Sequence, residues 1–333
     1  MTAAGSVGKS VRYDYDAPAC FAGFLVRVRP PSDLHGRFLT YWCQSKPYWD
    51  QLATGAVRST IENFSAGRYR SMMVPQPAIT QQQRIVDYLD RETAQIDALI
   101  GKQERLIETL RERRVVKLSE VIDRGGHAAW KLRRLVDPAR PMSYGILQAG
   151  EPQTEGVPYI GPSDMPGEGA APQVHTLRRT TPEIAAQYQR SVLSDRDVVV
   201  SIGPAFGKVA VLTSAHTGAN LTQDTVRVAC RTERLVPEYL VHVLGSLQVK
   251  HFWRRQIAGA TFVRLNLGTL ATTPIPLPDV AKQRRLIAEI DDHTARTDDL
   301  IAKADSFIAL ARERRAALIT AAVTGQIDVR VSA

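Results

Sequence analysis

The chain has 333 residues, 44% of them hydrophobic, and carries a net charge of +9. This size permits two domains with substantial cores, and the positive charge favours polyanionic partners, although many basic proteins bind no nucleic acid. Three widely spaced cysteines argue against a disulfide framework, and without an export signal or an apolar run of roughly 18 residues we expect a globular cytoplasmic protein.

The first predicted element is a turn within residues 1–13, MTAAGSVGKSVRY. This segment satisfies the loose pattern of an NTP-binding phosphate loop through Ala3, Gly8, Lys9 and Ser10. Such a loop needs a strand before it and a helix after it, whereas here only two residues precede Ala3 and an extended run leads to Pro18. The same Gly-Lys pair recurs at 207–208, where Val209 stands in place of the required Ser or Thr. A strand-turn-strand hairpin in both places is favoured over an ATP-binding enzyme.

The next segment, residues 75–122, recurs at residues 276–323 with a constant offset of 201. Gln82, Asp97 and Arg114, for example, recur as residues 283, 298 and 315. Weaker echoes link residues 48–56 to 252–260 and residues 26–28 to 226–228. The chain is therefore a duplication. Residues 130–199 have no counterpart in the first copy, so we expect that copy to lack its N-terminal part.

The repeated segments are predicted to be long helices, because residues 80–122 contain no proline and have apolar residues at coiled-coil spacing. One such helix would span about 60 Å and could bury its apolar stripe against the other copy in an antiparallel coiled coil. The predicted seam residues are Leu89, Ile96, Leu99, Leu106, Leu110, Leu286, Ile290, Leu300, Ile308 and Leu318.

The segment between the long helices is predicted to be rich in strands, with runs DVVVSI, KVAVL and TVRVAC, followed by a helix over residues 237–256. The fold class is therefore α/β (α+β). The predicted domains are a partial domain at 1–74, a long helix at 75–126, a complete domain at 127–275 and a second long helix at 276–333.

No catalytic constellation is found in the sequence. A methyltransferase signature, a dinucleotide loop and histidine pairs at metal-ligand spacing are all missing, and a solvated helix face explains the acidic run at 291–299 better than a metal site does. Basic and polar residues instead suggest a DNA-facing surface, since Lys and Arg neutralise phosphates and polar side chains read base edges. The candidates, each of which could also be an ordinary solvated residue, are Tyr144, Ser163, Arg178, Arg179, Ser201, Lys208, Gln223, Lys250, Arg254, Arg255 and Arg264.

The chain resembles the specificity subunits of Type I restriction-modification systems. The motifs that carry the resemblance are SYGILQAG at 143–150, VPYIGPSDM at 157–165, FGKVAVL at 206–212, NLTQDTVRV at 220–228 and PLPDVAKQRRLI at 276–287, together with the duplicated helix. The resemblance implies two target-recognition domains separated by the coiled coil, each reading half of a bipartite site in double-stranded DNA.

The resemblance also implies a non-catalytic chain without cofactors, whose partners are methyltransferase subunits that bind S-adenosylmethionine and methylate adenine in DNA. A restriction subunit that uses ATP and Mg²⁺ is a further expected partner in a complex that restricts. Because the motifs at 143–165 occur only once, we expect the first recognition domain to be incomplete. The alternatives are a truncated or degenerate regulatory subunit and a coiled-coil scaffold without sequence-specific DNA binding.

Overall fold

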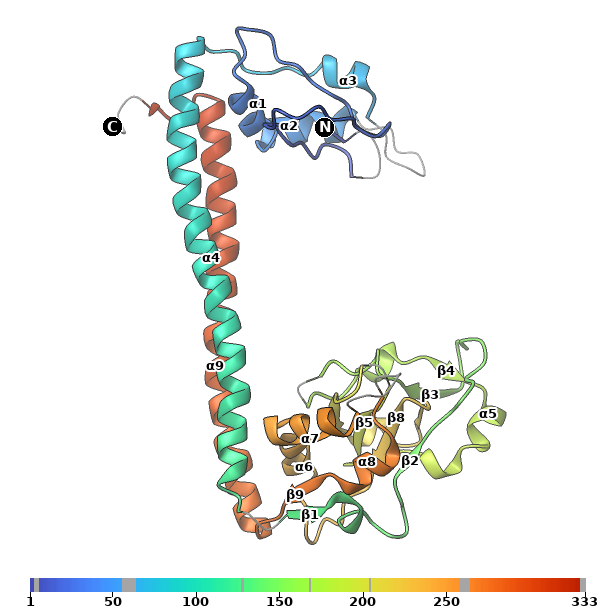
Figure 1. Cartoon of the computed structure of the whole chain (residues 1–333). Coiled ribbons are helices and arrows are strands. Elements are labelled where there is room, and N and C mark those ends of the chain that lie inside the picture. Colours follow the sequence, from blue (N-terminus) through green and yellow to red (C-terminus); the bar gives the residue numbers. More distant parts are fainter. Residues whose placement is uncertain are drawn as a thin grey trace. The chain divides into compact units, whose positions relative to one another are not determined.

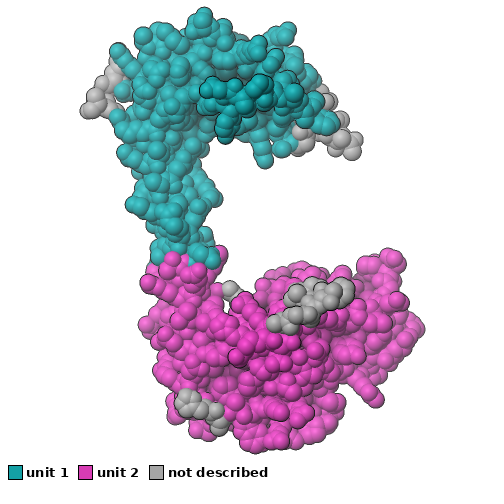
Figure 2. All heavy atoms as spheres, in the orientation of Figure 1, with its two compact units in different colours: residues 1–108, 301–333 teal, residues 109–300 magenta. Residues whose placement is uncertain are grey.

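The computed structural model describes residues 1–2, 6–55, 64–126, 129–167, 169–203, 205–257 and 264–329. The chain forms two compact units (Figure 2), of which unit 1 comprises residues 1–108 and 301–333 and unit 2 comprises residues 109–300. Each unit therefore contains part of both long helices, in contrast to the sequence-based boundaries, which give each helix a domain of its own. Among the described residues, no helix combines the length and apolar character that crossing a membrane requires.

The described residues form the helices and strands labelled in Figure 1. The α-helices are α1 (Gly36–Trp42), α2 (Lys46–Gly55), α3 (Ala66–Arg70), α4 (Ile79–Asp123), α5 (Pro182–Ala186), α6 (Pro237–Gly245), α7 (Leu247–Ile257), α8 (Leu267–Thr272) and α9 (Val280–Val323). The strands are β1 (Ala129–Lys131), β2 (Ser143–Tyr144), β3 (Val157–Ile160), β4 (Arg179–Thr180), β5 (Val198–Ser201), β6 (Val209–Val211), β7 (Asn220–Leu221), β8 (Thr225–Val228) and β9 (Pro274–Pro276).

Unit 2 contains a mixed α and β domain attached to the ends of the two long helices. The predicted strand runs are confirmed as β5, β6 and β8, which form an antiparallel sheet in the order β2-β8-β5-β6. A second sheet has the order β4-β3-β7, and β1 pairs with β9 where the chain enters and leaves the domain. All four side chains of β5 are buried, because α6 packs on one face of β5 and β6 (Figure 1) and a separate apolar cluster covers the other face of the sheet. Burial on both faces explains why the sequence of β5 is a continuous apolar run and does not alternate with polar residues.

The predicted single helix over 237–256 is wrong in one respect, because the structure breaks it into α6 and α7 at Ser246. Ser246 is buried and has extended backbone angles, and its hydroxyl donates to the Val243 carbonyl. The first amide of α7, on Leu247, donates to the Ser119 hydroxyl of α4 at 2.9 Å. An oxygen from a distant helix thus caps α7, which sequence spacing does not reveal.

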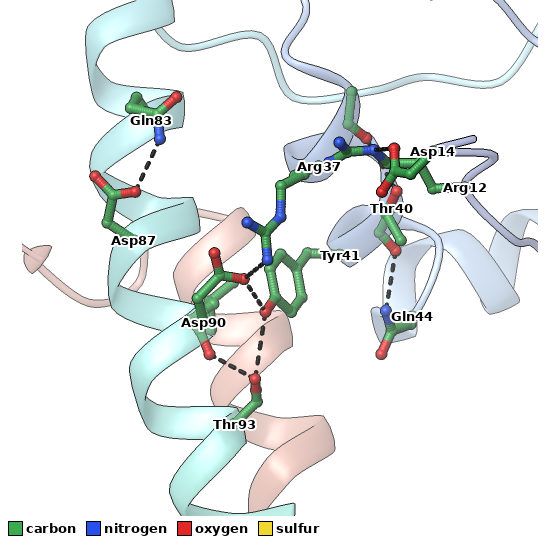
Figure 3. A network of polar contacts seen from close by, with 12 residues as sticks. Arg12, Asp14, Arg37, Thr40, Tyr41, Gln44, Gln83, Asp87, Asp90 and Thr93 are labelled. Atoms are coloured by element: carbon green, nitrogen blue, oxygen red, sulfur yellow. Dashed lines mark hydrogen bonds and ion pairs between the residues drawn. The ribbon is translucent and has the colours of Figure 1, made fainter. Parts of the chain in front are cut away.

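Unit 1 contains three short helices, α1 to α3, packed on α4 and the end of α9 around Phe38, Trp42 and Tyr48. A polar network attaches α1 to α4 (Figure 3): Arg37 Nη2 lies 2.6 Å from Asp90 Oδ1, and the Tyr41 hydroxyl donates to the same carboxylate at 2.7 Å. Partial burial raises the pKa of the Tyr41 phenol, so it remains a donor at neutral pH. The network fixes the orientation of α1 on the long helix.

The duplication predicted from the sequence is visible in hydrogen bonds that repeat at the same offset. Gln82 is fully buried, accepts from the His35 amide at 2.7 Å and donates to two backbone carbonyls, those of Asp33 and Pro77. Its counterpart Gln283 is equally buried and has the equivalent partners Val236, Arg234 and Pro278. The cap repeats as well, since the Lys46 amide at the start of α2 donates to the Thr320 hydroxyl at 3.0 Å.

The long helices pair antiparallel within each unit, and ion pairs repeat with the sequence. Arg315 Nε lies 3.0 Å from Asp97 in unit 1, and Arg114 Nη1 lies 2.7 Å from Asp298 in unit 2, so each acid of one copy contacts the arginine of the other. The aspartates of these pairs are more than half exposed, so each pair contributes little stability individually, although the Arg114 and Arg315 side chains are only 15% and 28% exposed. They do set the register of the two helices.

The predicted seam is correct for only part of its residues. Buried apolar contacts between the helices of unit 1 involve Ile96, Ile100, Ile107, Ala304 and Ile308. Leu99, Leu106 and Leu300 are wrongly assigned, since their side chains are 45%, 45% and 50% exposed. The remaining predicted residues are buried or half-buried: Leu110 and Leu318 lie partly exposed along the helices, and Leu89, Leu286 and Ile290 pack in the cores of the adjoining domains.

The N-terminal segment forms a turn rather than a phosphate loop, but the described residues of 1–13 contain no strand, so the predicted hairpin is confirmed only around Gly207; Ala3 itself lies outside the described residues. The Lys9 amide donates to the Thr2 hydroxyl at 3.0 Å, as the Lys208 amide does to Ser201 at 2.9 Å. Gly8 has a positive φ of 89°, and its amide donates to the Tyr69 hydroxyl. This amide is therefore already satisfied, in contrast to the free amides that hold phosphate in an NTP site.

Candidate nucleic-acid interface

The β5–β6 hairpin turn is held by two of the predicted DNA-binding residues. Ser201 is fully buried, and its hydroxyl donates to the Ala205 carbonyl at 2.8 Å while accepting from the Lys208 amide. The Lys208 ammonium donates to the carbonyls of Pro162 and Met165 at 3.0 and 2.8 Å. The prediction that Ser201 contacts DNA directly is therefore wrong. Lys208 uses two of its three N–H donors to hold the loop 161–165 against the hairpin.

The loop 161–165 carries a predicted arginine on its surface. The Arg178 guanidinium lies over the Tyr159 ring, 5.1 Å from its centroid, and contacts Asp164 Oδ2 at 3.3 Å. Ser163, which is exposed, lies 3.4 Å from the same guanidinium nitrogen. The Arg178 side chain remains 46% exposed, and a guanidinium has five donors, so several are free to contact a phosphate or a guanine edge.

A second arginine lies over the turn between β7 and β8. The Arg264 guanidinium donates to the Gln223 carbonyl at 3.0 Å and pairs with Asp224 at 3.0 Å, and its side chain remains 43% exposed. The Gln223 amide in turn donates to the Ile146 carbonyl, which brings the exposed Tyr144 and Leu147 next to this turn. Tyr144 thus offers an aromatic ring and a hydroxyl beside a half-exposed glutamine.

Close backbone approach makes these loops one continuous surface. A Cβ atom on Gly161 would lie 3.2 Å from the Thr222 methyl group and 3.3 Å from Arg178, and one on Gly203 would lie 2.9 Å from Asp224. A side chain at Gly203 would displace Asp224, and one at Gly161 would require Thr222 and Arg178 to move by a few tenths of an ångström. We call this surface the loop cluster; it consists of residues 144–147, 161–165, 178, 205–208, 222–224 and 264, with Gly203 beneath it.

The predicted basic residues outside the loop cluster lie on other elements. Arg254 and Arg255 are exposed near the end of α7 and line, with Gln248 and His251, a cavity of about 490 Å³. Lys250 on the same helix is half-buried. Arg179 belongs to β4, where its guanidinium donates to the Gly156 carbonyl at 2.9 Å. The α7 residues are connected to the loop cluster through Trp253, whose ring packs beneath Gly207 of the hairpin turn.

The sheet beneath the loop cluster is fixed by a buried polar network. Arg227 on β8 is 4% exposed and donates to the carbonyls of Val192 and Pro141. Burial, and then the nearby charge of Arg140, lower the pKa of Arg227, while Asp197 opposes this shift. Arg140 itself makes two contacts with the buried Asp197 carboxylate, at 2.9 and 2.6 Å. Such geometry gives a rigid base for the loops above it.

Three residues in or next to the loop cluster were overlooked in the sequence, because a search for DNA contacts looks first for basic residues. Asp164 and Asp224 orient Arg178 and Arg264, and Tyr159 supports the Arg178 guanidinium. Each of them lies inside a motif that the sequence already singles out, at 157–165 or 220–228. Membership of these motifs is the available signal, because Arg178 and Arg264 are far in sequence from the carboxylates that hold them.

The comparisons with known proteins agree on one family. Residues 146–306 match the family model of the Type I restriction modification DNA specificity domain, a range that begins in the loop cluster. The chain is 22% identical over 301 residues to the Type I restriction enzyme EcoBI specificity subunit of Escherichia coli, which covers 81% of this chain and 62% of that protein. The StySPI specificity subunit of Salmonella potsdam is 22% identical over 35% of this chain and 25% of its own length. The chain thus spans less than two thirds of the relatives' length.

Solved structures show the same fold. A chain from a study of complex assembly and conformational transition of the Type I R-M system aligns with a TM-score of 0.69 at 18% identity, covering 87% of this chain and 71% of that one. The HsdS subunit from Thermoanaerobacter tengcongensis aligns with a TM-score of 0.50 at 18% identity, covering 87% and 70%. Residues 146–306 thus match a Type I restriction modification DNA specificity domain, and the chain, with its duplicated helices, is similar to the specificity subunits of Type I restriction-modification systems over most of its length.

Proposed function

We propose that the chain is the DNA sequence-recognition subunit of a Type I restriction-modification complex and has no catalytic activity of its own. The observation that carries this proposal is the loop cluster, because it gathers exposed arginines, Gln223 and Tyr144 on a rigid sheet, and all of it except residues 144 and 145 lies in the region that matches the specificity-domain model. Its arginines are held by carboxylates and retain free donors, the arrangement expected of a surface that reads DNA rather than one that merely carries charge.

The proposed partners are double-stranded DNA and methyltransferase subunits, with restriction subunits in a complex that also cleaves DNA. S-adenosylmethionine, ATP and Mg²⁺ are assigned to those partners and not to this chain. The target is a bipartite site, because the repeated helices α1 to α3 and α6 to α8 give each unit an equivalent framework with the same buried glutamine. Linking two half-site contacts in one chain raises affinity above that of either alone.

Exposed apolar side chains on the long helices support a protein partner. Leu99, Leu106, Phe307 and Leu310 of unit 1 are 45%, 45%, 41% and 66% exposed. Leucines at heptad spacing that remain in water are suited to docking an amphipathic helix from another chain. We assign them to the contact with a methyltransferase subunit.

The test is a genome-wide map of methylated adenine in cells that express the chain with its cognate methyltransferase. We expect a methylated sequence motif that disappears on deletion of the gene, is weakened or relaxed by Arg178→Ala or Gln223→Ala, and persists in Arg190→Ala, an exposed arginine outside the loop cluster. Loss of one bidentate base contact costs about 1–3 kcal/mol of discrimination. If deletion left the methylation pattern unchanged although the chain still bound the methyltransferase, the protein would be a scaffold and the proposal would be wrong.

A further inference from the structure

A pocket of about 590 Å³ in unit 2 lies outside the loop cluster and has no role in the proposed function. It is formed by β1, the 3-10 helix Leu132–Arg134 that follows, the loop to Met142, the segment after β8 and the start of α8. Its apolar lining includes Trp130, Met142 and Leu267. The pocket is therefore built from three separate chain segments, residues 130–142, 231–234 and 267–271, that meet only in the folded domain.

The pocket combines this apolar lining with an excess of positive charge. Four arginines line it, Arg133, Arg134, Arg231 and Arg234, against a single acid, Asp137. Asp137 already accepts from the Ala139 amide at 2.9 Å. The Arg234 guanidinium lies 4.4 Å from the centroid of the Trp130 ring, a cation–π contact that holds it at the pocket.

The four guanidinium groups have no acidic partner within the described residues, since no carboxylate there lies within 4.0 Å of any of them. Two nearby arginines of the same domain behave differently. Arg140 pairs with Asp197 at 2.6 Å and Arg196 pairs with Glu238 at 2.8 Å. Carboxylates thus hold Arg140 and Arg196, whereas the four arginines of this pocket remain available to an acidic ligand.

The composition of the pocket distinguishes a protein ligand from DNA. Trp, Met and Arg are enriched where protein surfaces meet, and buried Trp and Arg supply most of the binding energy there. Interfaces with DNA are also rich in positive charge but are more polar, so the apolar lining of Trp130, Met142 and Leu267, and not the arginines, favours a protein ligand. Charge complementarity then requires that the protein ligand be acidic.

The pocket occurs in only one of the two copies. At the offset of 201, Arg231 and Arg234 correspond to Pro30 and Asp33, and residues 130–142 have no counterpart in the first copy. The ligand should therefore bind once per chain, whereas contacts made through the duplicated helices would occur twice.

We propose that this pocket binds an acidic segment of a partner protein, with an apolar side chain seated against Trp130 and Met142 and flanking carboxylates paired with the four arginines. The proposal goes beyond DNA recognition and does not depend on it. The probe is a short fluorescein-labelled peptide with a central Trp flanked by Glu on both sides, titrated against the full chain and followed by fluorescence anisotropy.

We expect saturable binding at one peptide per chain, weakened about tenfold or more by the double variant Arg133→Glu/Arg134→Glu, whose side chains are exposed so that the fold is retained. Arg254→Glu/Arg255→Glu makes the same change of charge on exposed α7 residues and should leave the affinity within about twofold. A control peptide with Gln in place of Glu, and one with Gly in place of Trp, should each bind more weakly.

The proposal is overturned if the peptide does not bind saturably, if both double variants weaken it equally, or if the Gly-substituted peptide binds as well as the original. Displacement of the peptide by duplex DNA from the wild-type chain would also overturn it, because DNA would then occupy the pocket. Sequence-specific DNA binding is measured for Arg133→Glu/Arg134→Glu as well, and we expect it to be normal. A failure of the peptide-binding proposal is then distinguishable from a failure of the DNA-recognition proposal.

Discussion

The buried glutamine at the start of each long helix makes a quantitative prediction about stability. Gln283 closes three hydrogen bonds, accepting from the Val236 amide at 2.9 Å and donating to the carbonyls of Arg234 and Pro278 at 2.7 and 2.9 Å. Gln283→Ala leaves all three backbone groups without this partner at a fully buried position. Each unsatisfied buried group costs about 1–3 kcal/mol. A water molecule that fills the space left by the side chain would restore some of these hydrogen bonds, so we expect the free energy of unfolding to fall by about 3 kcal/mol.

Hydrogen exchange measured by mass spectrometry is the appropriate assay, because it reports on each unit separately and does not require two-state unfolding. A loss of about 3 kcal/mol should accelerate exchange of the amides at 236–245 on the order of a hundredfold. Gln82→Ala removes the equivalent bonds in unit 1 and should accelerate the amides at 35–43 to a similar extent.

Gln83→Ala is the matched control. Gln83 is exposed on α4, next to Gln82 in the sequence, and among the contacts that the structure describes it bonds only to the Asp87 side chain. Its effect should stay within about 0.5 kcal/mol, as for most surface substitutions. The reasoning is refuted if Gln283→Ala accelerates exchange no more than Gln83→Ala, or if either buried variant affects the two units equally.

Two further predictions concern the partner and the pH. Leu99→Glu/Leu106→Glu should abolish co-purification with the methyltransferase while leaving the melting temperature nearly unchanged, because both side chains are already exposed. The control Ala94→Glu/Ala98→Glu adds the same charges on the same helix without removing an apolar contact. Equal loss of co-purification in both variants would contradict the assignment. Burial lowers the pKa of His242 below its usual value of 6.5, although Asp291 opposes the shift. The unfolded chain therefore binds a proton more readily, so stability from this group is present above pH 6.5 and falls as the pH drops through the folded-state pKa. Denaturation of His242→Gln should lose this part of the pH dependence, and an unchanged pH profile would count against the burial effect.

The sequence by itself determined the duplication, the two long helices and the strands of unit 2. Periodicity and β-branched runs are local properties, and the offset of 201 requires no knowledge of packing. For the same reason the motif order indicates the resemblance to specificity subunits, and the hairpin around Gly207 is recognisable from the glycine and its flanking runs. These features depend on residues close together in the chain.

The tertiary structure decided which candidate residues face water. Leu99 and Ile100 satisfy the apolar pattern equally well, and only the register of the partner helix, set in part by pairs such as Asp97 with Arg315, buries Ile100 and exposes Leu99. Likewise Ser201 is occupied by the backbone of its own turn, because segments distant in sequence close over it. Burial is a property of contacts between remote segments, and the spacing of residues along one segment does not contain it.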